Sequence, residues 1–224
     1  MGLQKNTSQI KEKKESVKIP SGKVSIEGDL TIPKEPKGVV LFAHGSGSGR
    51  FSPRNQFVAK ELNKAGFATL LIDLLTKDEE SEDVFTGQFR FNIELLTERL
   101  ISATHWIRQD KLTEKFNIGY FGASTGAAAA LDSAAKLKDY IHAVVSRGGR
   151  PDLAEPWLSH VKAPTLLIVG GRDLPVIGIN EEALKKLNIE KKLIIVPDAG
   201  HLFEEPGALG KVAKHAADWF LKYL

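Results

Sequence analysis

The sequence predicts an α/β protein with a mostly parallel sheet of about seven to eight strands, helices on both faces and an N-terminal antiparallel hairpin. Two observations support this prediction. Short apolar runs, of the kind that form buried parallel strands, alternate with segments whose apolar residues recur at helical spacing. Most connections between them are short, which favours a single domain built on one sheet.

The individual elements follow from the apolar periodicity, and Ser21-Gly22 marks the turn of an edge hairpin. Residues 76–88 are polar and acidic, so a surface loop is expected there. Too little sequence separates the sixth and seventh strands for a large lid domain. Strands are predicted at 17–20, 24–33, 38–43, 67–75, 116–121, 141–145, 164–169 and 192–196, and helices at 53–65, 89–107, 124–137, 181–187 and 205–224.

Charge and composition argue against several classes of binding partner and reactive site. The 224 residues carry 31 basic and 28 acidic side chains, interspersed along the chain, which gives no electrostatic reason to expect nucleic acid or a membrane. There is no cysteine, so disulfides, thiolate metal sites and cysteine nucleophiles are excluded. We expect a cytoplasmic monomer or homodimer that acts on a small-molecule substrate.

The first residues differ from the rest of the chain. Residues 1–16 are polar and lack the apolar core of a secretory signal, so we interpret them as a mobile leader that precedes a domain at 17–224. No apolar run approaches the ~20 residues that a membrane-spanning helix needs.

Ser124 lies where a predicted strand turns directly into an alanine-rich helix, within Gly122-Ala123-Ser124-Thr125-Gly126. In that context Gly-x-Ser-x-Gly predicts a nucleophile elbow, because a sharp turn exposes the serine hydroxyl and needs small neighbours. The alternative is a glycine-rich turn between strand and helix that has no catalytic role.

Two further residues at predicted strand ends complete a Ser, Asp, His order. Asp173 ends a strand in GGRD and His201 follows another in PDAGH. A serine needs an imidazole to take its proton and a carboxylate to orient that imidazole. We therefore predict Ser124 as nucleophile, His201 as base and acid, and Asp173 as orienter. Asp198 is a rival for the carboxylate, and a turn aspartate or surface histidine is the alternative without function.

Two backbone N–H groups are expected to stabilise a developing oxyanion. Thr125 immediately follows the nucleophile, and Ser46 lies in the glycine-rich loop after the first parallel strand. His44 opens that loop; we expect it mainly to support the loop, and it is also a candidate for substrate contact.

Three arginines surround the predicted site. Arg147 ends a strand, and Arg50 and Arg54 follow the glycine-rich loop. Because arginine holds carboxylate or phosphate with a planar fork, we hypothesise an acidic substrate. The alternative is that Arg147 pairs internally with Asp152 or Asp173.

Other ligand motifs are weak. The loop HGSGSGR lacks the Gly-Lys-Ser/Thr ending of a P-loop, and the six histidines show no metal-ligand spacing such as HExxH. We expect no metal and no cofactor.

The chain resembles the α/β-hydrolase superfamily from about Val17 onward, and within it the dienelactone hydrolase-like group. The stretches that carry the resemblance are VVLFAHGSGSGRFSPRN, FGASTGAAAA, VVSRGGRPDLA, PTLLIVGGRD and VPDAGHLFEEPGAL. Dienelactone hydrolase itself uses a cysteine, whereas this chain has Ser124, so the resemblance implies the fold and the triad positions but not dienelactone as substrate. Several stretches are similar to a hydrolase domain that some bacterial proteins join to a phosphoribosyltransferase-like domain, which we do not expect here because the sequence ends with the last predicted helix.

These predictions converge on a serine hydrolase of small esters, acidic ones among them, acting through an acyl-serine intermediate. An acyltransferase or thioesterase could use the same three residues. A binding or sensor protein on the same scaffold is the alternative from another class, since a fold does not fix a function.

Overall fold

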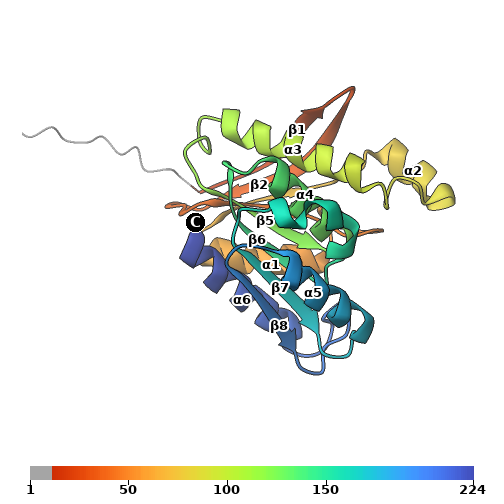
Figure 1. The fold of residues 1–224 in the computed structure, drawn as a ribbon. Coiled ribbons are helices and arrows are strands. Elements are labelled where there is room, and N and C mark those ends of the chain that lie inside the picture. Colours follow the sequence, from red (N-terminus) through yellow and green to blue (C-terminus); the bar gives the residue numbers. More distant parts are fainter. Residues whose placement is uncertain (1–11) are drawn as a thin grey trace, which may run out of the picture.

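The computed structural model describes residues 12–224, which form one eight-stranded sheet with helices on both sides (Figure 1). The strand order is β1-β2-β4-β3-β5-β6-β7-β8, and all neighbours from β4 to β8 are parallel. The fold is that of an α/β-hydrolase. The strands are β1 (Lys13–Ser21), β2 (Val24–Ile32), β3 (Val39–Ala43), β4 (Ala68–Ile72), β5 (Ile118–Ala123), β6 (Ile141–Arg147), β7 (Thr165–Gly170) and β8 (Lys191–Val196).

The helices bury the two faces of the sheet separately. One apolar cluster joins the sheet to α1 and α6, and the other joins it to α3, α4 and α5. Strands β3, β4, β5 and β7 are buried along their whole length, which explains their continuous apolar sequence. The helices are α1 (Pro53–Lys64), α2 (Lys77–Thr86), α3 (Ile93–Gln109), α4 (Thr125–Lys136), α5 (Leu174–Lys186) and α6 (Ala208–Tyr223), with a 3₁₀ helix over Pro151–His160.

The predicted edge hairpin is confirmed, but its first strand begins four residues earlier than expected. β1 and β2 pair antiparallel, and β2 joins the parallel strands through β4, also antiparallel. β1 begins at Lys13, so residues 13–16, assigned from sequence to the leader, belong to the sheet. They pair with the far end of β2, from Ile32 to Asp29. Residues 1–11 of the predicted leader lie outside the described residues.

The loop predicted over residues 76–88 is wrong, because that segment contains α2. Thr76 accepts a hydrogen bond from the backbone of Glu79, whose side chain in turn accepts from the backbone of Thr76. This capping box begins the helix, and Gly87 with φ 66° ends it. The acidic run of its first turn also suits the positive end of a helix.

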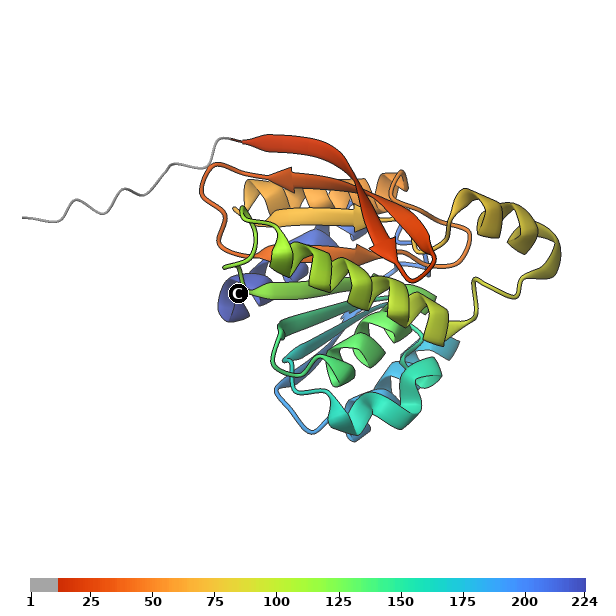
Figure 2. The same cartoon turned by 90° about the horizontal axis from the view of Figure 1, so that it is seen from above.

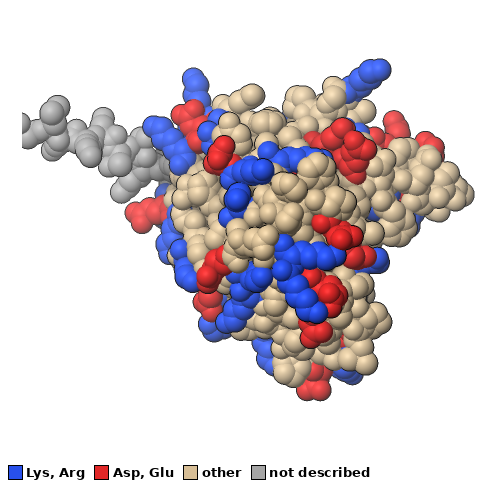
Figure 3. Space-filling model, in the orientation of Figure 1, with Lys and Arg blue, Asp and Glu red and all other residues tan. Residues whose placement is uncertain are grey.

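Helix α2 stands away from the body of the molecule (Figures 1 and 2). Its outer end carries few charges in the space-filling view, whereas basic and acidic side chains are intermixed over the rest of that face (Figure 3). Near the C-terminal end of α2, Val84 and Phe85 have 72% and 90% of their surface exposed.

Helix α5 begins earlier than predicted, at Leu174 instead of residue 181, so it follows Asp173 without an intervening loop. No helix within residues 12–224 is both long enough and apolar enough to cross a bilayer.

Candidate active site

Ser124 occupies a strained turn between β5 and α4. Its φ of 50° and ψ of −121° are rarely adopted by a residue with a side chain. Its neighbours must be small: a Cβ at Gly126 would collide with the carbonyl oxygens of Ala43 and His44, and one at Gly122 with the backbone of α4. The glycines of the motif therefore let strand, turn and helix approach closely enough to present the serine.

Asp173 and His201 meet across the ends of β7 and β8. Asp173 Oδ2 lies 2.6 Å from His201 Nδ1, and this bond fixes the direction of the imidazole. Asp198, the rival carboxylate, has φ 61°, and its backbone carbonyl accepts a hydrogen bond from the Arg172 side chain. The structure therefore pairs the histidine with Asp173.

Gly148 lies between the His201 imidazole and the backbone that holds Ser124. A Cβ placed on Gly148 would be 3.4 Å from ring atoms of His201. Gly148 follows Arg147, whose carbonyl oxygen accepts the N–H of Ser124 at 3.2 Å. Within residues 12–224 no hydrogen bond involves the Ser124 hydroxyl or His201 Nε2, so both remain available to a substrate. Bonds of this kind often tighten only when substrate binds.

The glycine-rich loop after β3 lies directly against the serine. A Cβ on Gly45 would be 2.9 Å from that of Ser124, so the loop can come this close only with glycine there. The hydroxyls of Ser46 and Thr125 are 3.0 Å apart. Neither of these two residues donates its backbone N–H to a hydrogen bond within the described residues, so both N–H groups could serve an oxyanion.

His44 supports the loop through both ring nitrogens, and the residue also lines the cavity described below. The ring is buried; Nδ1 lies 2.9 Å from the carbonyl oxygen of Gly45, and Nε2 accepts the N–H of Leu74 at 2.9 Å. Both ring nitrogens are thus used by the backbone, which requires the neutral ring. Burial lowers the pKa of His44, which agrees with that requirement.

Arg50 fastens the same loop to the end of β4. Its backbone N–H and its guanidinium both bind the carboxylate of Asp73, and the guanidinium also meets Glu27 at 2.6 Å and Asp29 at 3.4 Å. Three carboxylates thus neutralise Arg50, although the residue also lines the cavity beside the serine turn. We call the contacts of Arg50 with Asp73 the clamp. A Cβ on Gly49 would be 2.8 Å from Asp73 Oδ1, so the clamp requires a glycine at this position.

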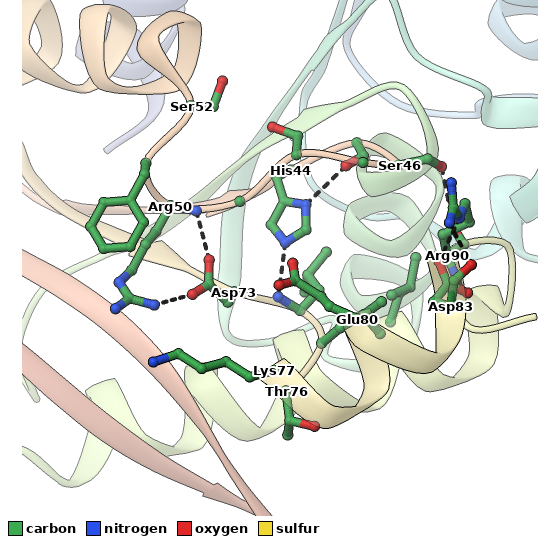
Figure 4. Close-up of a pocket in the computed structure, with 18 of the residues that line it drawn as sticks. His44, Ser46, Arg50, Ser52, Asp73, Thr76, Lys77, Glu80, Asp83 and Arg90 are labelled. Atoms are coloured by element: carbon green, nitrogen blue, oxygen red, sulfur yellow. Dashed lines mark hydrogen bonds and ion pairs between the residues drawn. The ribbon is translucent and has the colours of Figure 1, made fainter. Parts of the chain in front are cut away.

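A cavity of about 820 Å³ opens beside the serine turn. Its walls include Ser46 and Thr125, the clamp of Arg50 and Asp73, and the first turns of α2 (Figure 4). Glu80 extends from α2 toward Asp73 (Figure 4). Partial burial, and then the charge of Asp73, raise the pKa of the Glu80 carboxyl. Ser124, Asp173 and His201 are not among the residues that line this cavity, which reaches the serine turn through Thr125.

The remaining two arginines have different surroundings. Arg54 lines the rim of the cavity and meets the exposed Glu204 at 3.1 Å. Arg147 is buried and pairs with neither Asp152 nor Asp173, because those carboxylates bind Arg150 and His201. The predicted internal pairing of Arg147 is therefore wrong.

Sequence reasoning missed the roles of Asp73 and Glu80. Asp73 lies inside the strand predicted at 67–75, whereas β4 ends at Ile72 and leaves Asp73 at the end of the strand. A charged residue within an otherwise apolar run was the available signal. Its partner Arg50 could not be read from the sequence, because the pairing depends on how the loop folds back over the sheet. Glu80 was missed because α2 was predicted as a loop.

Comparison with known proteins adds a family and several relatives. The model of the dienelactone hydrolase family matches residues 26–224. The crystal structure of a dienelactone hydrolase from Anabaena variabilis is 56% identical, with a TM-score of 0.94, and the match covers 96% of this chain and 100% of that one. Est1E from Butyrivibrio proteoclasticus has a TM-score of 0.78 at 16% identity, covering 92% and 98% of the two chains, which is a likeness of fold alone.

A Mycobacterium tuberculosis protein named "Putative phosphoribosyl transferase" is 53% identical over 210 residues, which are 94% of this chain and 46% of that protein. The chain thus spans about half the length of this relative.

Proposed function

The chain belongs to the dienelactone hydrolase family, and on that basis we propose that it is a serine hydrolase that cleaves small carboxylic esters through an acyl-serine intermediate. Ser124 is the nucleophile, His201 moves the proton, and Asp173 holds the imidazole in place. The observation that carries the proposal is the 2.6 Å bond from Asp173 to His201 at the rim where Ser124 occupies its strained turn. Dienelactone need not be the substrate, because the chain has no cysteine.

The reaction would proceed in two halves. His201 Nε2 takes the proton of Ser124 as the hydroxyl oxygen attacks the ester carbonyl, and the imidazolium is stabilised by Asp173. The N–H groups of Ser46 and Thr125 receive the negative charge of the tetrahedral oxygen. His201 then gives the proton to the leaving alcohol, and water repeats the sequence to release the acid.

The test is covalent labelling combined with turnover. A fluorophosphonate probe should label Ser124, and Ser124→Ala should lower hydrolysis of p-nitrophenyl acetate by about a thousandfold or more. Ser159→Ala, at an exposed serine far along the chain, is the matched control and should keep full activity. Turnover by Ser124→Ala at the wild-type rate would refute the proposal.

Acyl transfer and thioester cleavage would use the same residues and differ only in leaving group or acceptor. Adding alcohol or thiol acceptors and following the partition of product separates them from hydrolysis. Phosphoribosyl transfer, the activity in the name of the M. tuberculosis relative, is not part of this proposal, because this chain spans about half of that protein.

A further inference from the structure

Arg147 is a buried cation that has no carboxylate partner in the part of the chain that the structure describes. It ends β6, whose alternate residues Ala143 and Val145 belong to the apolar cluster under α1 and α6, so its side chain enters the layer between the sheet and α1. Only 6% of its surface is exposed. Among residues 12–224 no carboxylate lies within ion-pair distance, and the buried Nε has no hydrogen-bond partner.

The neighbours of Arg147 given by its contacts are uncharged or basic. Its Nη2 lies 3.5 Å from Asn55 Oδ1, and its guanidinium lies 5.9 Å from the ring centre of Phe203. Burial, and then the nearby charge of Arg54, lower the pKa of Arg147 to about 10, so the side chain is still charged at neutral pH. An uncompensated buried charge is costly, whereas a carboxylate or phosphate beside it would be strongly bound.

The first turn of α1 faces the same place and offers further donors. This helix of 12 residues begins with Ser52 as N-cap and Pro53, and Ser52 makes no side-chain cap. The Ser52 hydroxyl and Arg54 Nε are buried without a partner. The backbone N–H groups of Arg54 and Asn55 make no hydrogen bond within the described residues. Such a helix start, with its partial positive charge, favours an anion.

The other deeply buried arginines differ in this respect. Arg50 meets three carboxylates, and Arg99 meets Glu79 at 2.7 Å. The fold thus neutralises its buried guanidinium groups elsewhere with its own side chains. Arg54, the charged neighbour of Arg147, pairs with Glu204, which is exposed.

We propose that Arg147, Arg54 and the first turn of α1 form a subsite for an oxyanion, a carboxylate or phosphate, carried by the substrate. Its place makes this chemically useful, because the carbonyl oxygen of Arg147 accepts the N–H of Ser124 and a Cβ on the next residue, Gly148, would meet the His201 ring. Ser52 and Arg54 also line the cavity, so an ester in the cavity could extend a charged group past them. The inference rests on the proposed function and specifies its substrate as an ester with an anionic group a few bonds from the scissile carbonyl.

The binding experiment does not need turnover. In Ser124→Ala protein, inorganic phosphate and succinate are titrated by calorimetry and thermal shift, and both should bind. Adding Arg147→Met should weaken that binding by about tenfold or more. Arg150→Gln is the matched control, because Arg150 lies three residues on, half-exposed and paired with Asp152. It should bind like the parent. Arg54→Met, at a partly exposed position, gives a second variant if Arg147→Met does not fold.

The kinetic experiment identifies the source of the anion. Arg147→Met should raise KM for mono-p-nitrophenyl glutarate by about tenfold or more and change kcat/KM for p-nitrophenyl butyrate by less than about twofold. Phosphate binding that depends on Arg147, without preference for the anionic ester, would support the subsite and assign it to a free oxyanion. Unchanged phosphate and succinate binding in Arg147→Met, with equal effects on both esters, would overturn the inference. Absence of turnover on every ester would refute the hydrolase but leave the binding result readable.

Discussion

Two buried arginines lie at the carboxyl edge of the sheet, and their surroundings have opposite charge. Arg50 is 8% exposed and is held by Asp73, Glu27 and Asp29. Arg147 is 6% exposed, with a second arginine nearby and no carboxylate within ion-pair distance in residues 12–224. The two arginines are therefore buried to a similar extent but differ in role: Arg50 fixes a loop, and Arg147 is available to a ligand.

The largest expected effect is on Arg50. Arg50→Met should lower the free energy of unfolding by about 3–5 kcal/mol, because it leaves Asp73 and its neighbours partly buried without a cation. Chemical denaturation measures this loss. Arg150→Met removes an exposed pair and should cost no more than about 1 kcal/mol. Similar small losses in both variants would mean that the Arg50 cluster is not a structural clamp.

A smaller effect is expected in catalysis when the clamp loses its charge. Asp73→Asn should lower kcat by about tenfold, equivalent to ~1.4 kcal/mol, with little change in KM, because the loop that carries Ser46 shifts. Steady-state kinetics on a neutral ester checks this. Asp29→Asn is the matched control, since Asp29 meets Arg50 at 3.4 Å without binding the loop backbone. Equal kcat values for the two variants would contradict the positioning role.

Arg147 should respond in the opposite sense to Arg50. Arg147→Met, in buffer without oxyanions, should leave the free energy of unfolding unchanged or raise it by about 1 kcal/mol, because a costly buried charge becomes apolar. Chemical denaturation without phosphate measures the change in the free energy of unfolding. Repeating it with phosphate shows whether the variant has lost the stabilisation that bound phosphate gives to the parent. A loss of several kcal/mol would remove the contrast and make Arg147 a structural residue.

The smallest effect concerns Glu204, the exposed partner of Arg54. Glu204→Gln frees Arg54 from an exposed pair worth about 0.2–1 kcal/mol, so succinate should bind up to about fivefold more tightly. Calorimetry on the Ser124→Ala background measures it. Glu190→Gln, at an exposed pair with Lys222, should have no effect. Weaker binding in Glu204→Gln would mean that Glu204 helps to hold the ligand.

The errors in the sequence-based prediction have local causes. Helix α2 was predicted as a loop because its residues are polar, although Thr76, Glu79 and Gly87 carry the capping signals of a helix. The start of α5 was missed because Val176, Ile177 and Gly178 are weak helix formers, and tertiary packing overrides that preference. Buried strands were predicted well because a strand covered on both faces must be apolar throughout.

The sequence by itself determined the sheet, the elbow at Ser124 and the chain order of serine, aspartate and histidine, because periodicity and small residues at a sharp turn are local properties. The tertiary structure decided which charges meet. Within residues 12–224, Arg50 pairs with three carboxylates and Arg147 with none, although both lie at the carboxyl edge of the sheet. Pairing of charges depends on distances between segments far apart in the chain, and these are fixed only when the sheet and its loops assemble.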